Sequence, residues 1–165
     1  MQLSVTNVLF VSRENAYRSL LAEACLRHLG RGRFKAYSCG VPALLAIGPN
    51  KWTAVALHTA SIPEDGLRCK SWSEFTRSGA PRMDFVISLD SETLHEHPIW
   101  PGQPNTALWN YPPITAKKPG SAEYSLAAVQ TLLSLRRRLE LLVSLHSGLR
   151  ARADLGHDIQ DLAHL

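Results

Sequence analysis

Short apolar segments alternate along this chain with longer segments whose apolar residues recur at helical spacing. The short segments, which predict buried strands of a parallel sheet, lie at residues 8–11, 34–38, 85–89 and 106–109. Helical spacing predicts helices from residue 19 to the glycines at 30 and 32, over 49–60 and over 121–146, and a short helical turn at 71–76. The alternation indicates an α/β fold, in which helices cover both faces of a four-stranded parallel sheet in three α/β/α layers.

The last predicted helix is the longest, and one apolar face is expected along it. The residues assigned to that face are Leu126, Val129, Leu132, Leu133, Leu139, Leu142 and Val143. On the exposed side, Glu140 can pair with Arg136 or Arg137. Prolines exclude regular structure from residues 111–120, and residues 98–104 are expected to form an ordered loop. We predict one domain over residues 1–148 and a C-terminal tail over residues 149–165 that can add a helix.

Composition is that of an ordinary globular chain. Of 165 residues, 45% are hydrophobic and 19% are charged, and no apolar run approaches the roughly 20 residues that span a bilayer. With no signal peptide evident, we expect a cytoplasmic protein that does not enter a membrane. The formal net charge of +4 suits anionic ligands, but the arginines are scattered, so nucleic-acid binding is weakly supported. Three widely spaced cysteines argue against a disulfide framework.

The loop between the first strand and the first helix is the strongest candidate for a ligand site. In such sheets, ligands bind at the carboxyl ends of the strands, and a helix N-terminus there offers backbone N–H groups to anions. Arg18 can present two donors to a tetrahedral oxyanion, and Asn15 tolerates the left-handed backbone that such a cradle requires. A plain strand–helix connection with a solvated arginine explains the same residues equally well.

A resemblance to a known family favours the first interpretation. The opening VLFVSRENAYRSLLAEA resembles that of the low-molecular-weight tyrosine phosphatases, which have an apolar strand, a cysteine, five residues, Arg-Ser and a helix containing Ala-Glu. Asn15 stands three residues after the cysteine position, as in that family. RFKAYSCG resembles the second strand and its turn, and GLRCKSWSEF, APRMDFVISL and HPIWPGQPNTALWNYP resemble the arsenate-reductase branch. The likeness extends from about residue 7 to residue 146.

Four positions depart from the pattern that the resemblance implies. Ser12 stands where the family has its nucleophilic cysteine, and a serine hydroxyl is a far weaker acid than a thiol. Pro113 stands at the position of the general-acid aspartate and cannot transfer a proton. The two further cysteines of the arsenate reductases would fall near Asp90 and at His97. These joint losses predict a catalytically inactive member of the family.

The resemblance nevertheless implies an anion-binding loop. Its expected residues are Ser12, Arg13, Glu14, Asn15, Ala16, Tyr17, Arg18 and Ser19. Phosphate, sulfate or arsenate is the expected ligand, a protein partner is a further expectation, and no cofactor is predicted. Against binding, Glu14 adds negative charge to the loop and Tyr17 is bulky enough to close it. Two alternatives stay open: an active phosphatase or arsenate reductase that uses non-standard residues, and a partner- or nucleic-acid-binding module that reuses the fold.

The remaining reactive residues have simpler interpretations. Cys25 is expected to be buried and inert, Cys39 to pack in the core, and Cys69 to be exposed. His95 and His97 lack the partner cluster of a metal site and are expected on a surface loop. Asp90 can act as an acid or base or can cap the helical turn that follows it, while Trp100 and Trp109 are expected to be structural.

Overall fold

The computed structural model describes residues 5–114, 122–146 and 152–165. The strands are β1 (Thr6–Val11), β2 (Phe34–Cys39), β3 (Phe85–Ser88) and β4 (Asn105–Leu108). The α-helices are α1 (Arg18–Leu29), α2 (Lys51–Thr59), α3 (Ala122–Leu145) and α4 (Arg152–Leu162). Three short 3₁₀ helices complete the regular structure: η1 (Pro42–Leu44), η2 (Trp72–Phe75) and η3 (Glu92–Glu96).

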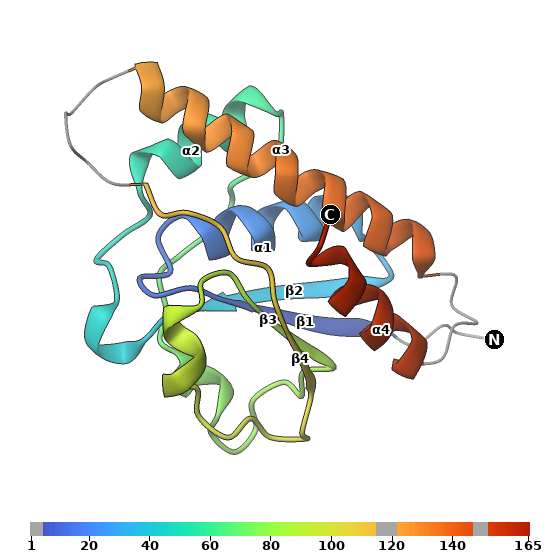
Figure 1. Ribbon diagram of the computed structural model, residues 1–165. Helices are drawn as coiled ribbons and strands as arrows, with labels where there is room; N and C mark the ends of the chain where they lie inside the picture. The colour runs from blue at the N-terminus through green and yellow to red at the C-terminus, as the bar shows by residue number, and fades with distance from the viewer. Residues whose placement is uncertain (1–4, 115–121, 147–151) are drawn as a thin grey trace.

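The four strands form one parallel sheet in the order β2-β1-β3-β4, with β1 in the interior of the sheet (Figure 1). Val11, the last residue of β1, is level with Cys39 on one side and Ser88 on the other. The carboxyl ends of three strands therefore meet at one edge, and the loop after β1 begins there. The predicted fold, a four-stranded parallel sheet flanked by helices, is confirmed.

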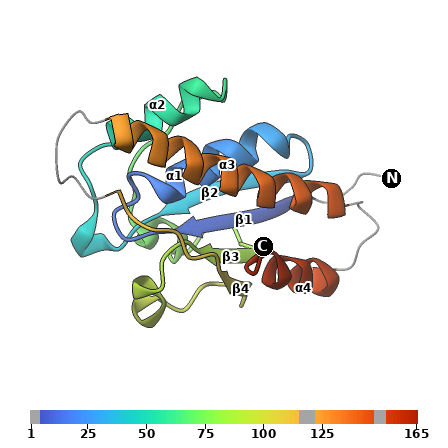
Figure 2. The same ribbon diagram turned by 45° about the horizontal axis from the view of Figure 1, so that its top comes forward.

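Each face of β1 supplies a different part of the core. Val8 and Phe10 pack with the helices α1 to α4 in the main cluster of buried residues, whereas Leu9 and Val11 join a second cluster around Phe75. This split follows from the two-residue period of a strand, which sends alternate side chains to opposite faces. Because both faces of β1 are covered, its apolar run is continuous rather than alternating. Figure 2 shows α1, α2 and α3 together on one side of the sheet.

The apolar face predicted for α3 is wrong at two positions. Leu126 and Leu133 are 58% and 55% exposed, while Leu132, Leu139 and Leu142 are buried as expected. Consecutive residues on a helix point about 100° apart, and at Leu133 this step carries the side chain past the buried face that includes Leu132. The buried positions that the sequence reading missed are Ala128, Leu135 and Arg138. The predicted ion pair between Glu140 and Arg136 is confirmed, with Arg136 Nε and Glu140 Oε1 2.9 Å apart.

The C-terminal tail adds the helix that the sequence left open, α4. Its residues Leu155, Ile159 and Leu162 belong to the main core cluster, and the indole Nε1 of Trp109 donates to the carbonyl of Ile159 at 2.9 Å. The predicted boundary between residues 148 and 149 lies outside the described residues, as do residues 115–120 of the proline-rich segment. Within the described part of the chain, no helix combines the length and apolarity needed to cross a membrane.

Candidate functional site

The chain passes from β1 to α1 at the carboxyl edge of the sheet (Figure 1). A cleft lies against this loop. The loop supplies most of its lining: Ser12, Arg13, Glu14, Asn15, Ala16, Tyr17 and Arg18. Asn50, Asp90, Glu92, Pro113 and Ile114 complete it from other segments. Seven of the eight residues predicted for the loop thus line the cleft, and Ser19 lies buried behind Ser12.

The carbonyl groups of the loop are bound on its outer side by the segment that follows β2. Arg13, Glu14 and Ala16 accept hydrogen bonds from the backbone N–H groups of residues 41, 46 and 50 at 2.8–3.0 Å. In a planar trans peptide, the N–H points opposite to the C=O. The peptide N–H groups of residues 14, 15 and 17 therefore point away from the groups that bind these carbonyls, and all three residues line the cleft. Backbone N–H groups at a helix N-terminus are suited to an anion.

The loop keeps this curvature through one strained residue and one close contact. Asn15 has φ of 52°, the left-handed conformation that the sequence reading allowed it. Gly40 lies so close that a Cβ there would come within 2.9 Å of the Asn15 Cβ and 3.0 Å of the Arg13 carbonyl oxygen. A side chain at residue 40 would push the loop away from the end of β2.

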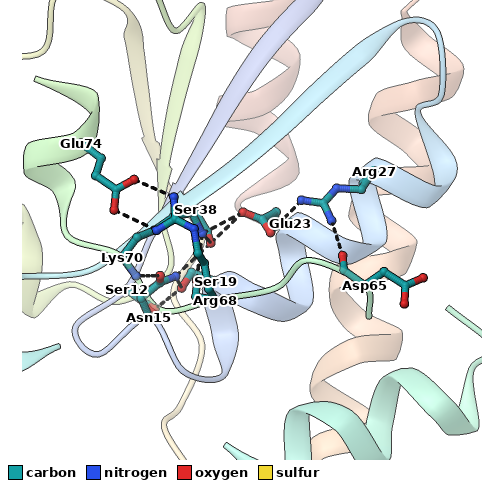
Figure 3. A network of polar contacts seen from close by, with 10 residues as sticks. All are labelled: Ser12, Asn15, Ser19, Glu23, Arg27, Ser38, Asp65, Arg68, Lys70 and Glu74. Carbon is teal, nitrogen blue, oxygen red and sulfur yellow. Dashed lines mark hydrogen bonds and ion pairs between the residues drawn. The ribbon is translucent and has the colours of Figure 1, made fainter. Parts of the chain in front are cut away.

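A buried polar network supports the loop from behind (Figure 3). Asn15 Nδ2 donates to Ser19 Oγ at 2.7 Å and to Ser38 Oγ at 2.9 Å, and Asn15 Oδ1 accepts from the Lys70 backbone N–H at 2.8 Å. The Lys70 donor fixes the orientation of the amide, because only its oxygen can face an N–H. One side chain thereby joins the loop to α1, β2 and the segment before η2.

The network also reaches Ser12. Ser19 Oγ, which accepts from Asn15, lies 2.6 Å from Ser12 Oγ, and either hydroxyl can be the donor between the two serines. The network partner of Ser12 is thus another neutral hydroxyl, which is not a base that could remove a proton from Ser12.

A buried ion pair closes the far end of the network. Lys70 Nζ lies 3.1 Å from Glu23 Oε1, and both side chains are at least nine-tenths buried. Ser38 Oγ donates to Glu23 Oε1 and accepts from Lys70 Nζ, each at 3.0 Å, and Arg27 reaches the other Glu23 oxygen at 2.9 Å. Glu23 thus has partners on both oxygens, which is the condition under which a buried carboxylate is tolerated.

Arg18 is held from two sides at the base of the cleft. Its Nη1 donates to the Tyr111 carbonyl at 2.8 Å, and its Nη2 lies 3.4 Å from Asp90 Oδ2. Burial lowers the pKa of Arg18 from its ordinary value, and the nearby Asp90 carboxylate acts in the opposite direction. A guanidinium nonetheless stays protonated in proteins, so Arg18 places a fixed positive charge in the cleft.

Asp90 has a structural task in addition to this pairing. Its Oδ1 accepts from the Thr93 backbone N–H at 3.0 Å, which ties it to the first turn of η3, although the N-cap position predicted for Asp90 is occupied by Ser91. Its Oδ2 accepts from the Arg13 backbone N–H, also at 3.0 Å. Asp90 therefore occupies one N–H of the loop and one face of Arg18. Its predicted alternative role as an acid or base stays a prediction.

The mouth of the cleft is exposed and strongly charged. Arg13 Nη1 lies 2.8 Å from Glu92 Oε2, with 43% and 67% of the two side chains exposed. Glu14 is exposed on the same rim, and Pro113 lines the cleft without offering any proton donor. Tyr17 does not close the cleft, contrary to the concern raised by its size. Its ring is 7% exposed and packs in the main core cluster.

The cysteines are poorly suited to act as nucleophiles. Cys25 and Cys39 are fully buried, and burial raises the pKa of Cys25 to about 12 and that of Cys39 further still. Cys69 is half-buried rather than exposed as predicted, and burial raises its pKa as well. A thiol with a raised pKa carries little thiolate at neutral pH.

The two histidines were predicted to lie on a surface loop, and this is wrong for His97. His95 is exposed on η3, but His97 is half-buried. The Nε2 atom of His97 is hydrogen-bonded to Ser88 Oγ at 3.1 Å, and its ring packs edge-on against Trp72 and Trp100. Burial lowers the pKa of His97. Among the described residues, no group of three or more His, Cys, Asp or Glu side chains is placed to hold a metal ion.

Comparison with known families assigns the chain. The family model described as low molecular weight phosphotyrosine protein phosphatase matches residues 7–105, more than half of the chain. This protein belongs to that family. The search of curated proteins found no match to this chain by sequence.

Solved structures agree with the assignment at the level of the fold. An arsenate reductase in the phosphate binding state is 21% identical with a TM-score of 0.67, over 87% of this chain and 100% of its own. YfkJ from Bacillus subtilis is 23% identical with a TM-score of 0.63, over 89% and 98%. The tyrosine phosphatase AmsI from Erwinia amylovora is 17% identical with a TM-score of 0.60, over 84% and 92%. A structure described as an arsenate reductase and one described as a tyrosine phosphatase thus share the fold of this chain.

Sequence reasoning missed the network behind the loop and half of the cleft rim. Glu23, Ser38 and Lys70 come from three separate segments, and no local pattern connects them. Glu23 carried the one available signal, because a glutamate within the apolar face of α1 requires a buried partner. Glu92 and Asn50 lie in segments whose position against the loop depends on the tertiary fold.

Proposed function

We propose that this phosphatase-family protein binds an oxyanion in the loop of residues 12–19 and does not catalyse phosphoester hydrolysis or arsenate reduction. The observation that supports binding is the conjunction, in one cleft, of inward-turned N–H groups with the buried guanidinium of Arg18. An anion there would be bound by charge-assisted hydrogen bonds, which are about twice as strong as neutral ones. The solved arsenate reductase in the phosphate binding state is consistent with this use of the fold.

The chemistry at residue 12 supports the absence of catalysis. The hydroxyl of Ser12 is hydrogen-bonded to that of Ser19, which is not a base, and no described histidine lines the cleft. Pro113, at the position that the family resemblance assigns to the general acid, cannot donate a proton to a leaving group. A proton donor in this kind of reaction is worth roughly 10²–10⁴-fold in rate. Ser19 and Pro113 therefore supply neither a base nor an acid.

Titration of inorganic phosphate, followed by calorimetry and by ³¹P NMR, tests the binding half of the proposal. Binding at millimolar concentration or better is expected for the natural protein and for Arg31→Ala, a control arginine that is exposed and lies outside the cleft. Arg18→Ala should lose binding, and Arg18→Lys should retain only part of it because an ammonium cannot replace the two-pronged guanidinium. Absence of any phosphate effect, or equal binding by Arg18→Ala with native circular dichroism, would overturn the proposal.

Turnover assays test the catalytic half. The natural protein should show no hydrolysis of p-nitrophenyl phosphate and no thioredoxin-coupled arsenate reduction beyond that of the Ser12→Ala variant. Steady turnover that Ser12→Ala abolishes would show that the hydroxyl is activated after all.

A further inference from the structure

The charges around the cleft are unusual for a site that takes a free anion. The described lining contains two cations, Arg13 and Arg18, and three carboxylates, those of Glu14, Asp90 and Glu92. Each arginine already has a carboxylate partner, at 2.8 Å and 3.4 Å. The lining therefore carries one more negative than positive charge, and a bound dianion would add to the excess. This balance weakens the attraction for free phosphate, sulfate or arsenate.

Glu14 is the carboxylate that this pairing leaves over. Among the described residues it has no ion-pair partner, and its side chain is exposed on the rim of the cleft. Its backbone is fixed, because its carbonyl accepts from the N–H of residue 46 at 3.0 Å. Its charge acts on Arg18, so the two groups share one electrostatic environment. A cation beside the anion-binding position would meet Glu14 without displacing any existing pair.

On the basis of the proposed function, we propose that the cleft selects a phosphate monoester that carries a cationic group close to its phosphate. The phosphate lies against the loop N–H groups and Arg18, and the ammonium or guanidinium of the ligand pairs with Glu14 on the rim. The ligand's positive charge offsets the excess negative charge of the lining. Pro113 and Ile114, which also line the cleft, offer apolar contact for the short carbon linker of the ligand.

A matched pair of probes isolates the cationic group. O-Phosphoethanolamine and n-propyl phosphate have the same length, and they differ in an ammonium against a methyl group. An exposed ion pair contributes up to about 1 kcal/mol, so phosphoethanolamine should bind roughly two- to fivefold more tightly in calorimetry at low salt. The difference should shrink at high ionic strength, because exposed charges are screened there.

Two charge variants assign the preference to its residue. Glu14→Gln should bind both esters equally and should bind n-propyl phosphate at least as well as the natural protein does. Glu64→Gln, which removes one exposed carboxylate outside the cleft, should keep the full preference. Equal binding of both esters by the natural protein, or a preference that survives Glu14→Gln, would overturn this inference and leave anion binding intact. Failure of inorganic phosphate and both esters to bind would overturn the proposed function and this inference with it.

Discussion

The two sides of the loop at residues 12–19 are built in opposite ways. Behind it, Asn15, Ser19, Ser38, Glu23 and Lys70 are all buried and hydrogen-bonded to one another. In front of it, the cleft rim consists of exposed charges such as the pair between Arg13 and Glu92. The shape of the loop and its chemistry therefore depend largely on different groups, although Asp90 serves both through the Arg13 N–H and Arg18.

This separation lets residues in the cleft change while the fold persists. Breaking a buried pair costs about 3–5 kcal/mol, whereas an exposed pair contributes about 0–1 kcal/mol. Pro113 lies outside the buried network, and Ser12 touches that network only through Ser19 Oγ, so substitutions at either residue leave the other hydrogen bonds that hold the loop in place. We therefore expect chemistry and stability to respond to different substitutions.

The largest expected effect is on catalysis and comes from the front side alone. Ser12→Cys should introduce slow hydrolysis of p-nitrophenyl phosphate, because a helix N-terminus and a nearby arginine, here those of α1 and Arg18, stabilise a thiolate. Adding an acid in Ser12→Cys/Pro113→Asp should raise kcat by roughly a further 10²–10⁴-fold. Steady-state kinetics would measure both steps.

The matched control for the added acid is Ser12→Cys/Pro113→Asn, which has nearly the same shape and no acidic proton. It should stay at the rate of Ser12→Cys. Equal rates for the Asp and Asn variants would mean that an acid at residue 113 does not reach the leaving group, and the predicted gain in kcat would then be wrong.

The next effect is on stability and comes from the back side. Lys70→Met leaves the Glu23 carboxylate, 2% exposed, without its ammonium partner, and we expect the free energy of unfolding to fall by about 3–5 kcal/mol in urea titrations. Arg136→Gln breaks an exposed pair on α3 and should change it by less than about 1 kcal/mol. A loss below 1 kcal/mol for Lys70→Met would contradict the contrast between the two sides.

The loop itself allows the back side to be divided further. Asn15→Gly keeps access to the left-handed backbone but removes the amide's hydrogen bonds, so it should cost about 1–3 kcal/mol. Asn15→Ala removes the same hydrogen bonds and also the easy access to the left-handed backbone. It should lower the free energy of unfolding by about 1–2 kcal/mol more than Asn15→Gly does, because a side chain with a Cβ disfavours φ near 52°. Urea denaturation of both variants would measure the difference, and equal stability would show that the backbone is not strained there.

Sequence patterns predicted most of the fold because its elements depend on local periodicity. The buried strands β1 and β3 are continuous apolar runs, and Asn15 marks the left-handed position in the loop between two predicted elements. The errors arose where tertiary contacts decide. Leu133 lies on an exposed face of α3 despite its hydrophobicity, and His97 is drawn against Trp72 and Trp100 by a fold that no local pattern describes.

The candidate site divides in the same way. On the front side, residues 12–19 were predictable because they are contiguous, whereas Asn50 and Glu92 of the cleft lining were missed. The ion pair of Glu23 with Lys70 joins residues 47 positions apart through the meeting of α1 with the chain before η2, and only packing places them together. Long-range pairing of this kind leaves no signal at a fixed spacing in one sequence.

The smallest expected effect concerns two histidines that repeat the contrast between buried and exposed groups. Burial lowers the pKa of His97 in the folded protein below its ordinary value near 6.5, and the Asp90 carboxylate opposes this. Between the two pKa values the unfolded chain binds more protons at residue 97 than the folded protein does. The free energy of unfolding should therefore decrease as the pH falls below about 6.5 toward the lower, folded pKa.

His97→Gln, which can keep a hydrogen bond to Ser88, should make this decrease shallower, whereas His95→Gln removes an exposed histidine from the same segment and should leave the slope unchanged. Urea titrations at a series of pH values would measure the slopes, and identical slopes for the natural protein and His97→Gln would show that burial at residue 97 does not disfavour the charged ring.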